Sequence, residues 1–357
     1  MFPRTLLVLV FASLAALALS CTKPSGAPAG SADAETTTTT TSTTTGKVAF
    51  LLSTLQEERY QKDKKYFEDE AKRLGLSAFT FAADNDNARQ LSQVDSALSR
   101  GAKVLVIQPT DSAAAAAYVA KAHEKGAKVI AYDRSIAGTD VDFYVAHDSH
   151  AVGVLQAEAG MAYLKSLGGK GNVVLLNGQS GHSVATEIAR GYMDVLKPYI
   201  DKGDVKIVVE RNHDSWSPEQ ALKTMEDAIA KTKGDIQVIL ANNSGMARGA
   251  VQATQAARFK YVFIAGADAD AANVNYVCEG KQTVEVLKDI KPLAEKAAQV
   301  AGALLAGKPV EGAATTEKGK TPTVAVAVKL VDHQNARALL VDSGFHSEKS
   351  VPACAKK

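Results

Sequence analysis

The sequence of 357 residues has almost no excess of charge and little aromatic content. Lysine and arginine number 41 against 39 aspartate and glutamate residues, and the formal charge of +2 leaves no strong field to hold the chain on nucleic acid or on an anionic membrane. With 6% aromatic, 46% hydrophobic and 22% charged residues, the composition is that of a soluble globular protein. Fibrous, collagen-like and wholly disordered chains are excluded, and the length fits two domains of about 150 residues each.

Motifs for catalysis and cofactor binding are also missing. The segment LSTLQEERYQ has no G-x-G-x-x-G that would bring the backbone close to a pyrophosphate. The run Gly178–His182 is similar to the hydrolase motif G-x-S-x-G, but its second glycine comes one place too early, so Ser180 is expected to be a loop residue. His147 and His150 have no further clustered ligands, which favours solvated or capping roles. We therefore assign no catalytic residue, cofactor or metal.

The first twenty residues are typical of an export signal and are not expected to belong to the fold. The uncharged apolar stretch Leu6–Leu19 follows Arg4 and is too short for a membrane span, which needs about 20 residues. It fits the hydrophobic region of a signal peptide over residues 1–20. Residues Leu17–Cys21 resemble the bacterial lipobox, in which Cys21 is lipidated and becomes the mature N-terminus. An ordinary signal peptide beside an unrelated cysteine is the alternative.

Residues 21–46 are expected to form a lipid-anchored tether. They include Pro24, Pro28 and the run Thr36–Thr45, in which Ser42 is the one residue other than threonine, and they have almost no apolar side chains to bury. As a flexible coil, a segment of this length spans roughly 25–30 Å. A folded body on such a tether stays near a membrane surface.

The remaining two cysteines form an even pair. If Cys21 carries lipid, Cys278 and Cys354 are left in an oxidising compartment, where thiols tend to be bridged. We expect a disulfide between them, with two separate buried thiols as the alternative.

From Lys47 onward, short apolar strands alternate with helical patterns such as Glu57–Leu74 and Ala88–Arg100, which indicates βαβ units and parallel sheets. Because nearly continuous apolar strands need helices on both faces, each half should be a doubly wound α/β sheet. The predicted strands fall in two series: Val48–Leu52, Ala78–Ala82, Lys103–Pro109 and Lys128–Asp133, then Asn172–Gly178, Val205–Glu210, Ile236–Asn243 and Val262–Asp268.

Polar side chains stand at the carboxyl ends of these strands, where doubly wound sheets bind their ligands. Carboxylates and amides can serve several hydroxyl groups, a guanidinium donates two parallel hydrogen bonds, and an aromatic face packs on the apolar side of a sugar ring. The set therefore fits a neutral polyol, although a helix N-cap is the commoner role for any single Asp or Asn. The residues are Asp133-Arg134, Asn242-Asn243 and Asp268-Ala269-Asp270, with Arg59-Tyr60 and Trp216 nearby.

From about Lys47 to His346 the sequence resembles the D-xylose-binding proteins of ABC sugar importers, a branch of the type I periplasmic sugar-binding family. The resemblance lies in ERYQKDKKYFEDEAKRLG, VLVIQP, KVIAYDRSI, DFYVAHDSHAVGVLQAEA, GYMDVLKPYI, HDSWSPEQALKTMEDAI, GADAD and DSGFH. It implies two doubly wound parallel-sheet lobes joined by three crossovers, with a sugar enclosed between them. The first lobe would contain residues 47–150 plus about 288–316, and the second 151–286 plus about 320–357.

The resemblance also implies a set of sugar contacts. Trp216 matches the stacking tryptophan, and Tyr60 stands where relatives often have Trp, which keeps a ring and adds a hydroxyl. The implied contacts are Arg59, Tyr60, Asp133, Arg134, Trp216, Asn243, Asp268 and Lys288.

One loop departs from the family pattern. Relatives usually have a carboxylate followed by amides after the strand NVVLLNG, whereas this chain reads GQSGHSVATE, with His182 and Ser183 near those positions. Replacement contacts from His182, Ser183, Thr186 or Glu187, or a retreat of the loop, are the alternatives. The identity of the sugar is therefore less determined than sugar binding itself.

The implied function is capture of a monosaccharide, D-xylose foremost, and its delivery to the permease subunits of an ABC importer by a monomer that needs no cofactor and performs no chemistry. The protein is expected to be exported, periplasmic or at the cell surface, and to reach the membrane through its lipid. A sugar-sensing protein that presents its ligand to a membrane receptor, and a related pentose or hexose as ligand, are the alternatives. The export signal and the lack of a helix-turn-helix segment argue against the effector domain of a sugar-responsive repressor.

Overall fold

The computed structural model describes residues 46–310, 313–315 and 321–355. The predicted signal peptide (1–20), the predicted lipidation site Cys21 and the tether as far as residue 45 lie outside these described residues. Within the described ranges, no helix combines the length and the apolar character needed to cross a membrane.

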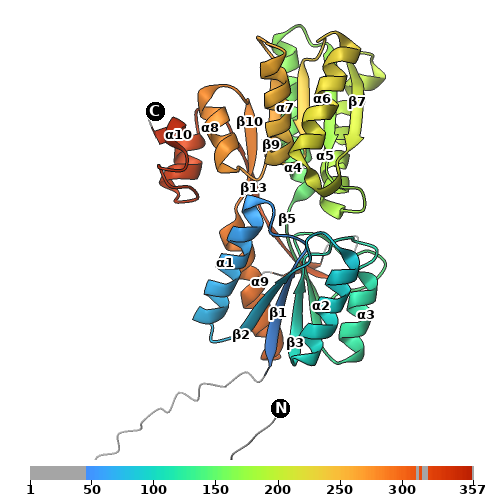
Figure 1. Cartoon of the computed structure of the whole chain (residues 1–357), viewed down its shortest axis with the longest axis vertical. Helices are drawn as coiled ribbons and strands as arrows, with labels where there is room; N and C mark the ends of the chain where they lie inside the picture. Colours follow the sequence, from blue (N-terminus) through green and yellow to red (C-terminus); the bar gives the residue numbers. More distant parts are fainter. Residues whose placement is uncertain (1–45, 311–312, 316–320, 356–357) are drawn as a thin grey trace, which may run out of the picture. The chain divides into compact units, whose positions relative to one another are not determined.

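The first of two sheets has seven strands in the described part of the chain, in the order β11-β12-β5-β4-β3-β1-β2. All its pairs are parallel apart from β11 with β12. Helices cover both of its faces (Figure 1). The strands are β1 (Lys47–Leu52), β2 (Ser77–Ala82), β3 (Ala102–Ile107), β4 (Lys128–Tyr132), β5 (Phe143–His147), β11 (Ala314–Thr315) and β12 (Pro322–Val326), and the helices are α1 (Glu58–Arg73), α2 (Asn87–Ser99), α3 (Ala116–Glu124) and α9 (Ile290–Leu305).

Strand β1 shows why this sheet needs two helical layers. Its side chains alternate between the faces, and none of Val48 to Leu52 is exposed. Phe50 packs in a cluster with Phe67 of α1 and Leu293 of α9. Leu51 packs on the other side, in a cluster with residues of α2 and α3.

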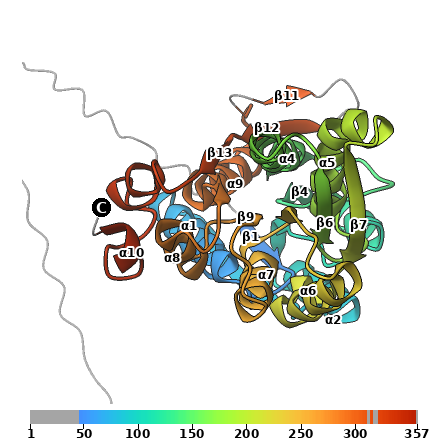
Figure 2. The ribbon, with the colours of Figure 1, turned by 90° about the horizontal axis from the view of Figure 1, so that it is seen from above.

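The second sheet has six strands among the described residues, in the order β13-β10-β9-β8-β6-β7, with β13 antiparallel to β10. Helices α4 and α5 lie on one side of it and α6 and α7 on the other (Figure 2). The elements are β6 (Gly171–Asn177), β7 (Val205–Asn212), β8 (Val238–Ala241), β9 (Phe263–Ala267), β10 (Val284–Lys288) and β13 (Val328–Val331), and α4 (Ser149–Ser166), α5 (Ser183–Asp201), α6 (Pro218–Thr232), α7 (Ser244–Ala256) and α8 (Ala271–Glu279). The predicted doubly wound α/β class is confirmed.

Two glycines let α4 and α5 touch. A Cβ on Gly153 would lie 2.1 Å from the Ile188 carbonyl oxygen, and one on Gly191 would lie 2.3 Å from the His150 carbonyl oxygen. The backbones of the two helices therefore approach more closely than any larger residue at these positions would allow.

The chain passes between the two sheets three times: from β5 to α4, from β10 to α9, and from β12 to β13. The third passage is later than the sequence suggested. Strand β12 pairs in parallel with β5, with Thr323 opposite Tyr144, so residues 322–326 belong to the first sheet rather than to a second lobe beginning near 320. We call each sheet with its helices the first lobe and the second lobe.

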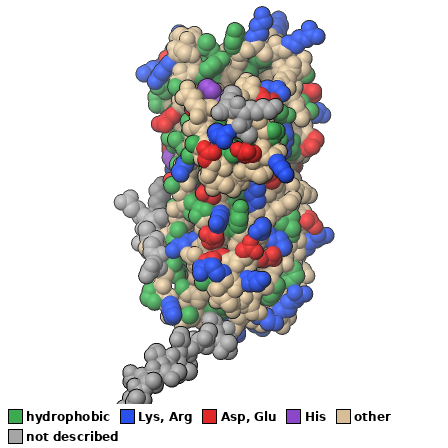
Figure 3. Space-filling model, turned by 90° about the vertical axis from the view of Figure 1, so that its left-hand side faces the viewer, with side chains coloured by type: hydrophobic (Ala, Val, Ile, Leu, Met, Phe, Trp, Pro, Cys, Tyr) green, Lys and Arg blue, Asp and Glu red, His purple; other side chains and the backbone are tan. Residues whose placement is uncertain are grey.

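The C-terminal segment packs against α8 of the second lobe. It contains a π-helical stretch (Arg337–Asp342) and α10 (Pro352–Ala355). Cys278 of α8 and Cys354 of α10 are joined by a disulfide, with Cα atoms 5.3 Å apart. Outside these buried contacts, the face shown in Figure 3 carries Lys and Arg interspersed with Asp and Glu, as the balanced composition predicts.

Candidate functional site

Side chains from the carboxyl ends of strands in both sheets meet around one small cavity. Arg59 lies in the first turn of α1, the helix that follows β1, Asp133 follows β4, and Lys288 ends β10. Each is brought there because parallel strands in one sheet end at the same edge. All eight side chains that the resemblance implied line this cavity: Arg59, Tyr60, Asp133, Arg134, Trp216, Asn243, Asp268 and Lys288.

Four of these side chains form a ring of ion pairs that joins the lobes. Arg59 of the first lobe places Nη2 3.1 Å from Asp133 Oδ1 and Nη1 3.2 Å from Asp268 Oδ1, and Asp268 belongs to the second lobe. Lys288 Nζ lies 3.6 Å from the same oxygen of Asp133 and 3.4 Å from that of Asp268. The side chain of Asp268, 11% exposed, is the most accessible of the four. Two cations and two carboxylates therefore neutralise each other in a site that is largely shielded from solvent.

The ionisation of the ring follows from these contacts. Burial alone would raise the pKa of Asp133, but Arg59, Lys288 and Arg134 together hold it well below its usual value. Asp63 lies behind Arg59 and accepts hydrogen bonds from Arg59 Nε and the Tyr132 hydroxyl. Burial raises the pKa of Asp63 to about 6 against the opposing charge of Arg59. Asp133 thus remains a charged acceptor throughout the physiological pH range.

Arg134 is held by two first-lobe partners. Its Nη1 donates to the Pro109 carbonyl oxygen at 3.0 Å, and its Nη2 donates to the Tyr60 hydroxyl at 3.1 Å. The residue is 1% exposed, and its Nε has no hydrogen-bond partner among the described residues. A buried guanidinium with a spare donor at the cavity wall is suited to a hydroxyl acceptor.

Trp216 is fixed in an unusual backbone conformation. Its φ is 56° and that of Ser215 is 52°, both in the left-handed region. The indole lies against Gly178, where a Cβ would come within 2.4 Å of the ring, and its Nε1 donates to His182 Nδ1 at 2.7 Å. The residue is 6% exposed, so it belongs to the cavity wall and to the second-lobe core at once.

Asn243 serves two roles. Its side-chain oxygen accepts from the Met246 backbone N–H at 2.9 Å, which makes it the N-cap of α7, and it also lines the cavity. The N-cap role that is common for Asn at a strand end is therefore present in Asn243 together with a place in the cavity wall.

His182 and Ser183 do not line this cavity. His182 is 1% exposed, and its Nε2 lies 2.6 Å from the Thr110 carbonyl oxygen of the first lobe. Ser183 Oγ accepts from the Ser135 backbone N–H at 2.9 Å. The loop that departs from the family pattern therefore makes contacts between the lobes.

The two histidines of the HDSH segment have different partners. His147 Nε2 lies 3.0 Å from the Asp289 carbonyl oxygen, and His150 Nε2 lies 2.7 Å from Asp194 Oδ2. Across the ranges that the structure covers, no group of three or more His, Cys, Asp or Glu side chains is arranged to hold a metal ion.

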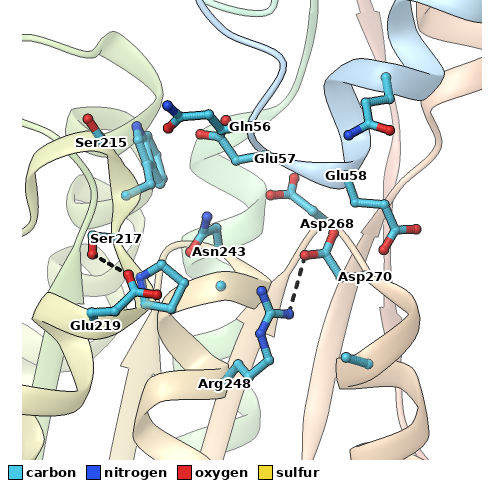
Figure 4. Close-up of a pocket in the computed structure, with 15 residues that line it drawn as sticks. Gln56, Glu57, Glu58, Ser215, Ser217, Glu219, Asn243, Arg248, Asp268 and Asp270 are labelled. Atoms are coloured by element: carbon cyan, nitrogen blue, oxygen red, sulfur yellow. Dashed lines mark hydrogen bonds and ion pairs between the residues drawn. The ribbon is translucent and has the colours of Figure 1, made fainter. Parts of the chain in front are cut away.

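A wider cavity of about 590 Å³ opens beside the small one and shares Glu57, Trp216, Asn243 and Asp268 with it (Figure 4). Arg248 and Asp270 pair on its second-lobe side, with Nη1 3.5 Å from Oδ2. Burial, followed by the charges of Asp268 and Glu58, raises the pKa of Asp270 to about 7. The inner cavity has a volume of only about 10 Å³, so its charged side chains are packed against one another.

Three wall residues were not among the eight. Glu57, Val184 and Asn242 also line the inner cavity. Asn242 stands at the end of a predicted strand, beside Asn243, so the sequence places it near the site. Glu57 and Val184 stand at the starts of helices, where no sequence pattern indicates a ligand contact. Gln108, at the end of VLVIQP, donates to Asp133 Oδ2 at 3.3 Å and is a strand-end residue of the same kind.

Comparison with known proteins places this geometry among sugar receptors. The family model described as periplasmic binding protein domain matches residues 48–309. The chain is 35% identical over 308 residues to the D-xylose-binding periplasmic protein of Escherichia coli, covering 85% of this chain and 92% of that protein. It is 29% identical to a multiple sugar-binding periplasmic receptor of Rhizobium radiobacter, over 84% of this chain and 91% of the receptor.

Solved structures agree in fold. An ABC transporter solute-binding protein from Clostridium phytofermentans, crystallised with bound β-D-glucose, superposes with a TM-score of 0.78 at 29% identity. The match covers 85% of this chain and 99% of that one. The small inner cavity thus lies in a fold that a solved glucose-bound protein shares.

Proposed function

The chain belongs to the periplasmic binding protein family, and on that premise we propose that it captures a monosaccharide, D-xylose before other sugars, and delivers it to an ABC importer. It is a binding protein and not an enzyme. The observation that carries the proposal is the meeting of eight polar and aromatic side chains, from strand ends of both lobes, around one inner cavity.

The charges of the inner cavity favour a neutral ligand. A charged ligand would leave one buried charge without a partner, which costs several kcal/mol. A polyol can accept from the cations and donate to the carboxylates through neighbouring hydroxyls while its ring packs on Trp216. The cations in the wall are Arg59, Arg134 and Lys288, and the carboxylates are Glu57, Asp133 and Asp268.

Two observations support a pentose. The relative with 35% identity is named for D-xylose, and the inner cavity of about 10 Å³ must widen to admit any sugar, so a pentose, which lacks the exocyclic hydroxymethyl group of a hexose, demands the smaller rearrangement. The solved relative that holds β-D-glucose makes a hexose the leading alternative.

The proposed mechanism is a change of lobe position. Sugar hydroxyls replace the direct Arg59–Asp268 ion pair, and contacts from both lobes then favour the closed form. The importer's membrane subunits recognise that closed form. Presentation of the closed form to a sensory receptor is the second candidate, supported by the relative named as a receptor.

We also propose that the protein is an exported monomer anchored by lipid at Cys21, on the lipobox-like residues Leu17–Cys21. Expressed with its signal, the wild type should be found in the membrane fraction and the Cys21→Ser variant in the soluble extracytoplasmic fraction. Equal partitioning of the wild type and the Cys21→Ser variant between the two fractions would contradict the lipid anchor.

A thermal-shift screen of monosaccharides tests the ligand. Binding to the folded state alone stabilises it by RT ln(1 + [L]/Kd), about 2.7 kcal/mol at a hundred times Kd. D-xylose should raise the Tm most, followed by D-glucose and other pentoses, and calorimetry should give a stoichiometry of one. A panel in which no sugar moves the Tm would overturn sugar capture, and a preference for a hexose would overturn the choice of D-xylose alone.

A further inference from the structure

His182 is held in one protonation state by two partners. Its Nδ1 accepts the indole N–H of Trp216 at 2.7 Å, and its Nε2 lies 2.6 Å from the Thr110 carbonyl oxygen. An indole N–H can only donate and a carbonyl can only accept, so Nδ1 must be bare and Nε2 must carry the proton. The planes of the imidazole and the indole are inclined by 25° with ring centroids 6.0 Å apart, so the two rings lie nearly coplanar, edge to edge along this hydrogen bond.

These partners belong to different lobes. Trp216 follows β7 of the second lobe, and Thr110 follows β3 of the first lobe. The same loop makes further contacts with the first lobe: the Ser112 backbone N–H donates to the Gly181 carbonyl oxygen at 3.1 Å, and the Ser183 N–H donates to Ser112 Oγ at 3.2 Å. The contact of His182 with Thr110 and these two hydrogen bonds need the lobes to be together, whereas the hydrogen bond between Trp216 and His182 lies within the second lobe.

We propose that His182 is the positioning residue through which closure of the lobes orients Trp216 against the sugar, and that sugar capture therefore depends on a neutral His182. The inference rests on the proposed function, because it assigns Trp216 a sugar to face. Thr110 sets the tautomer of His182 on closure, and that tautomer then holds the indole. With the lobes apart, the ring loses the partner that fixes its proton.

The charges around His182 all come from the first lobe. Asp133 and Arg134 follow β4, and Arg134 Nη1 approaches His182 Nε2 to 3.4 Å. Asp111 follows β3, and its carboxylate lies within 2.3 Å of where a Cβ on Gly181 would stand. From the second lobe the ring faces the uncharged indole of Trp216.

In this arrangement a proton on His182 is strongly disfavoured. Burial, and then the charge of Arg134, lower the pKa of His182 to about 2. With the lobes apart, water reaches the ring and the ordinary pKa of about 6.5 applies. Because the pKa is lower in the closed form, closure is fully favoured above about pH 6.5, and sugar affinity falls about tenfold per pH unit below it.

The test measures D-xylose affinity by calorimetry from pH 8 to pH 5.5. The wild type should bind with constant affinity at high pH, weaken by about fivefold from pH 6.5 to pH 5.5 and by about tenfold from pH 8 to pH 5.5, and release about one proton per sugar at pH 5.5 in buffers of different ionisation enthalpy. The His182→Gln variant should bind more weakly at pH 8, with little dependence on pH and no proton release.

Two controls separate His182 from other histidines. His147 is also buried, and burial with the charge of Lys288 lowers its pKa to about 3, so His147→Gln should keep the wild-type pH dependence if His182 is the titrating group. His150→Gln, whose ring pairs with Asp194 on the surface, should do the same. Loss of the dependence in His147→Gln, or its persistence in His182→Gln, would overturn the inference.

The inference and the proposed function fail differently. A wild type that binds no sugar at pH 8 removes the proposed function. If the wild type binds sugar with an affinity that does not change with pH, and releases no proton, then only the proposed role of His182 is wrong. Should His182→Gln not fold, the wild-type proton release and the His147→Gln profile still decide the question.

Discussion

Arg59 and Lys288 each contact carboxylates of both lobes, and this sharing is the main electrostatic feature of the site. Removing one partner of such a buried group leaves the others uncompensated, at a cost of about 3–5 kcal/mol. A sugar hydroxyl can instead enter between a cation and a carboxylate, because it both accepts and donates. The ring is therefore suited to exchange its direct contacts for bridged ones.

Arg134→Ala should abolish tight sugar binding and leave the fold intact. Loss of a charged donor to a hydroxyl costs about 1.5–3 kcal/mol, which is about a 10- to 150-fold increase in Kd. Calorimetry with D-xylose measures the effect, and thermal unfolding checks the fold. Arg89→Ala is the matched control, because Arg89 is half exposed and pairs with Asp84 on the surface. Equal affinity in wild type and Arg134→Ala would exclude the residue from the site.

Trp216 is the one tryptophan in the chain, so indole emission reports on a single place. Sugar that packs on the ring excludes water there, and emission should change saturably as D-xylose is added. Trp216→Leu should weaken binding by about tenfold or more, since it loses the flat face and the N–H donated to His182. Trp216→Phe, which keeps a ring, should bind between the two.

The opposite pattern for Trp216 is also informative. If Trp216→Leu lost most of its stability without sugar and kept its affinity for sugar, the residue would be core alone, as its place among buried second-lobe residues allows.

For individual residues, the sequence was sufficient to predict which side chains line the cavity, but it did not predict which side chains contact each other. Asp133 and Asp268 could be chosen because strand ends meet at one edge. The contact of His182 with Thr110 could not be predicted, because it depends on how the two lobes approach each other. That the chosen residues hold a sugar stays a prediction.

Among the secondary-structure elements, α10 depends most on a covalent link. It has four residues, Pro352–Ala355, too few to be stable as an isolated helix. Cys354 ties it to α8, and Val351 and Leu340 bury their side chains in the same cluster. The disulfide thus stabilises α10, which is too short to be a stable helix by itself.

A non-reduced digest should contain the linked Cys278 and Cys354 peptides, and the Cys278→Ser, Cys354→Ser double variant should unfold more easily. The sequence separation of 76 residues gives a loop-closure gain of about 4.5 kcal/mol as an upper figure. Sugar affinity should remain near that of the wild type, because neither cysteine lines the inner cavity. Two freely alkylated thiols in protein isolated from an oxidising compartment would contradict the pairing.

Strands within continuous apolar runs were predictable even where they are short, as in β4, β8 and β9, whereas β5 and β12 were not. β1 and β6 contain the continuous apolar runs 48–52 and 173–176 and were placed within one residue at each end. β5 has five residues and no flanking apolar run, and β12 gains its place by pairing with β5 from far along the chain. Such strands are defined by their neighbours more than by their own residues.

For the molecule as a whole, contacts outside the sugar site should contribute to affinity. Ser183 Oγ accepts from the Ser135 N–H across the lobes, and one hydrogen bond of this kind contributes about 0.5–1.5 kcal/mol to the closed form. Ser183→Ala should therefore bind D-xylose about 2- to 12-fold more weakly, although the residue does not line the inner cavity.

The control for Ser183→Ala is Ser166→Ala, since Ser166 bonds within its own lobe, to the Tyr163 carbonyl oxygen. X-ray scattering of the sugar-free proteins should show Ser183→Ala more expanded than either the wild type or Ser166→Ala. Wild-type affinity together with wild-type scattering would show that this contact does not influence closure.

The path of the chain between the lobes could be anticipated only in outline. Three crossovers followed from the resemblance, whereas the third passage after Val326 is fixed by the pairing of β12 with β5. One residue, Ala327, separates β12 from β13, and no composition change marks the transfer from one sheet to the other.

The late position of α9 has a consequence for how the protein is made. A chain that emerges from its N-terminus releases β1 to β5 first, then the whole run from α4 to β10, and only afterwards α9. Until then the face of β1 that carries Val48 and Phe50 lacks half of its cover, because Leu293 and its neighbours complete that cluster. Most of the second lobe, apart from β13 and the C-terminal segment, is available before α9, while the first lobe keeps an uncovered apolar surface that is open to proteases until α9 has arrived. A chain truncated before residue 290 therefore lacks α9, leaves this face of β1 partly uncovered, and should be degraded by cellular proteases.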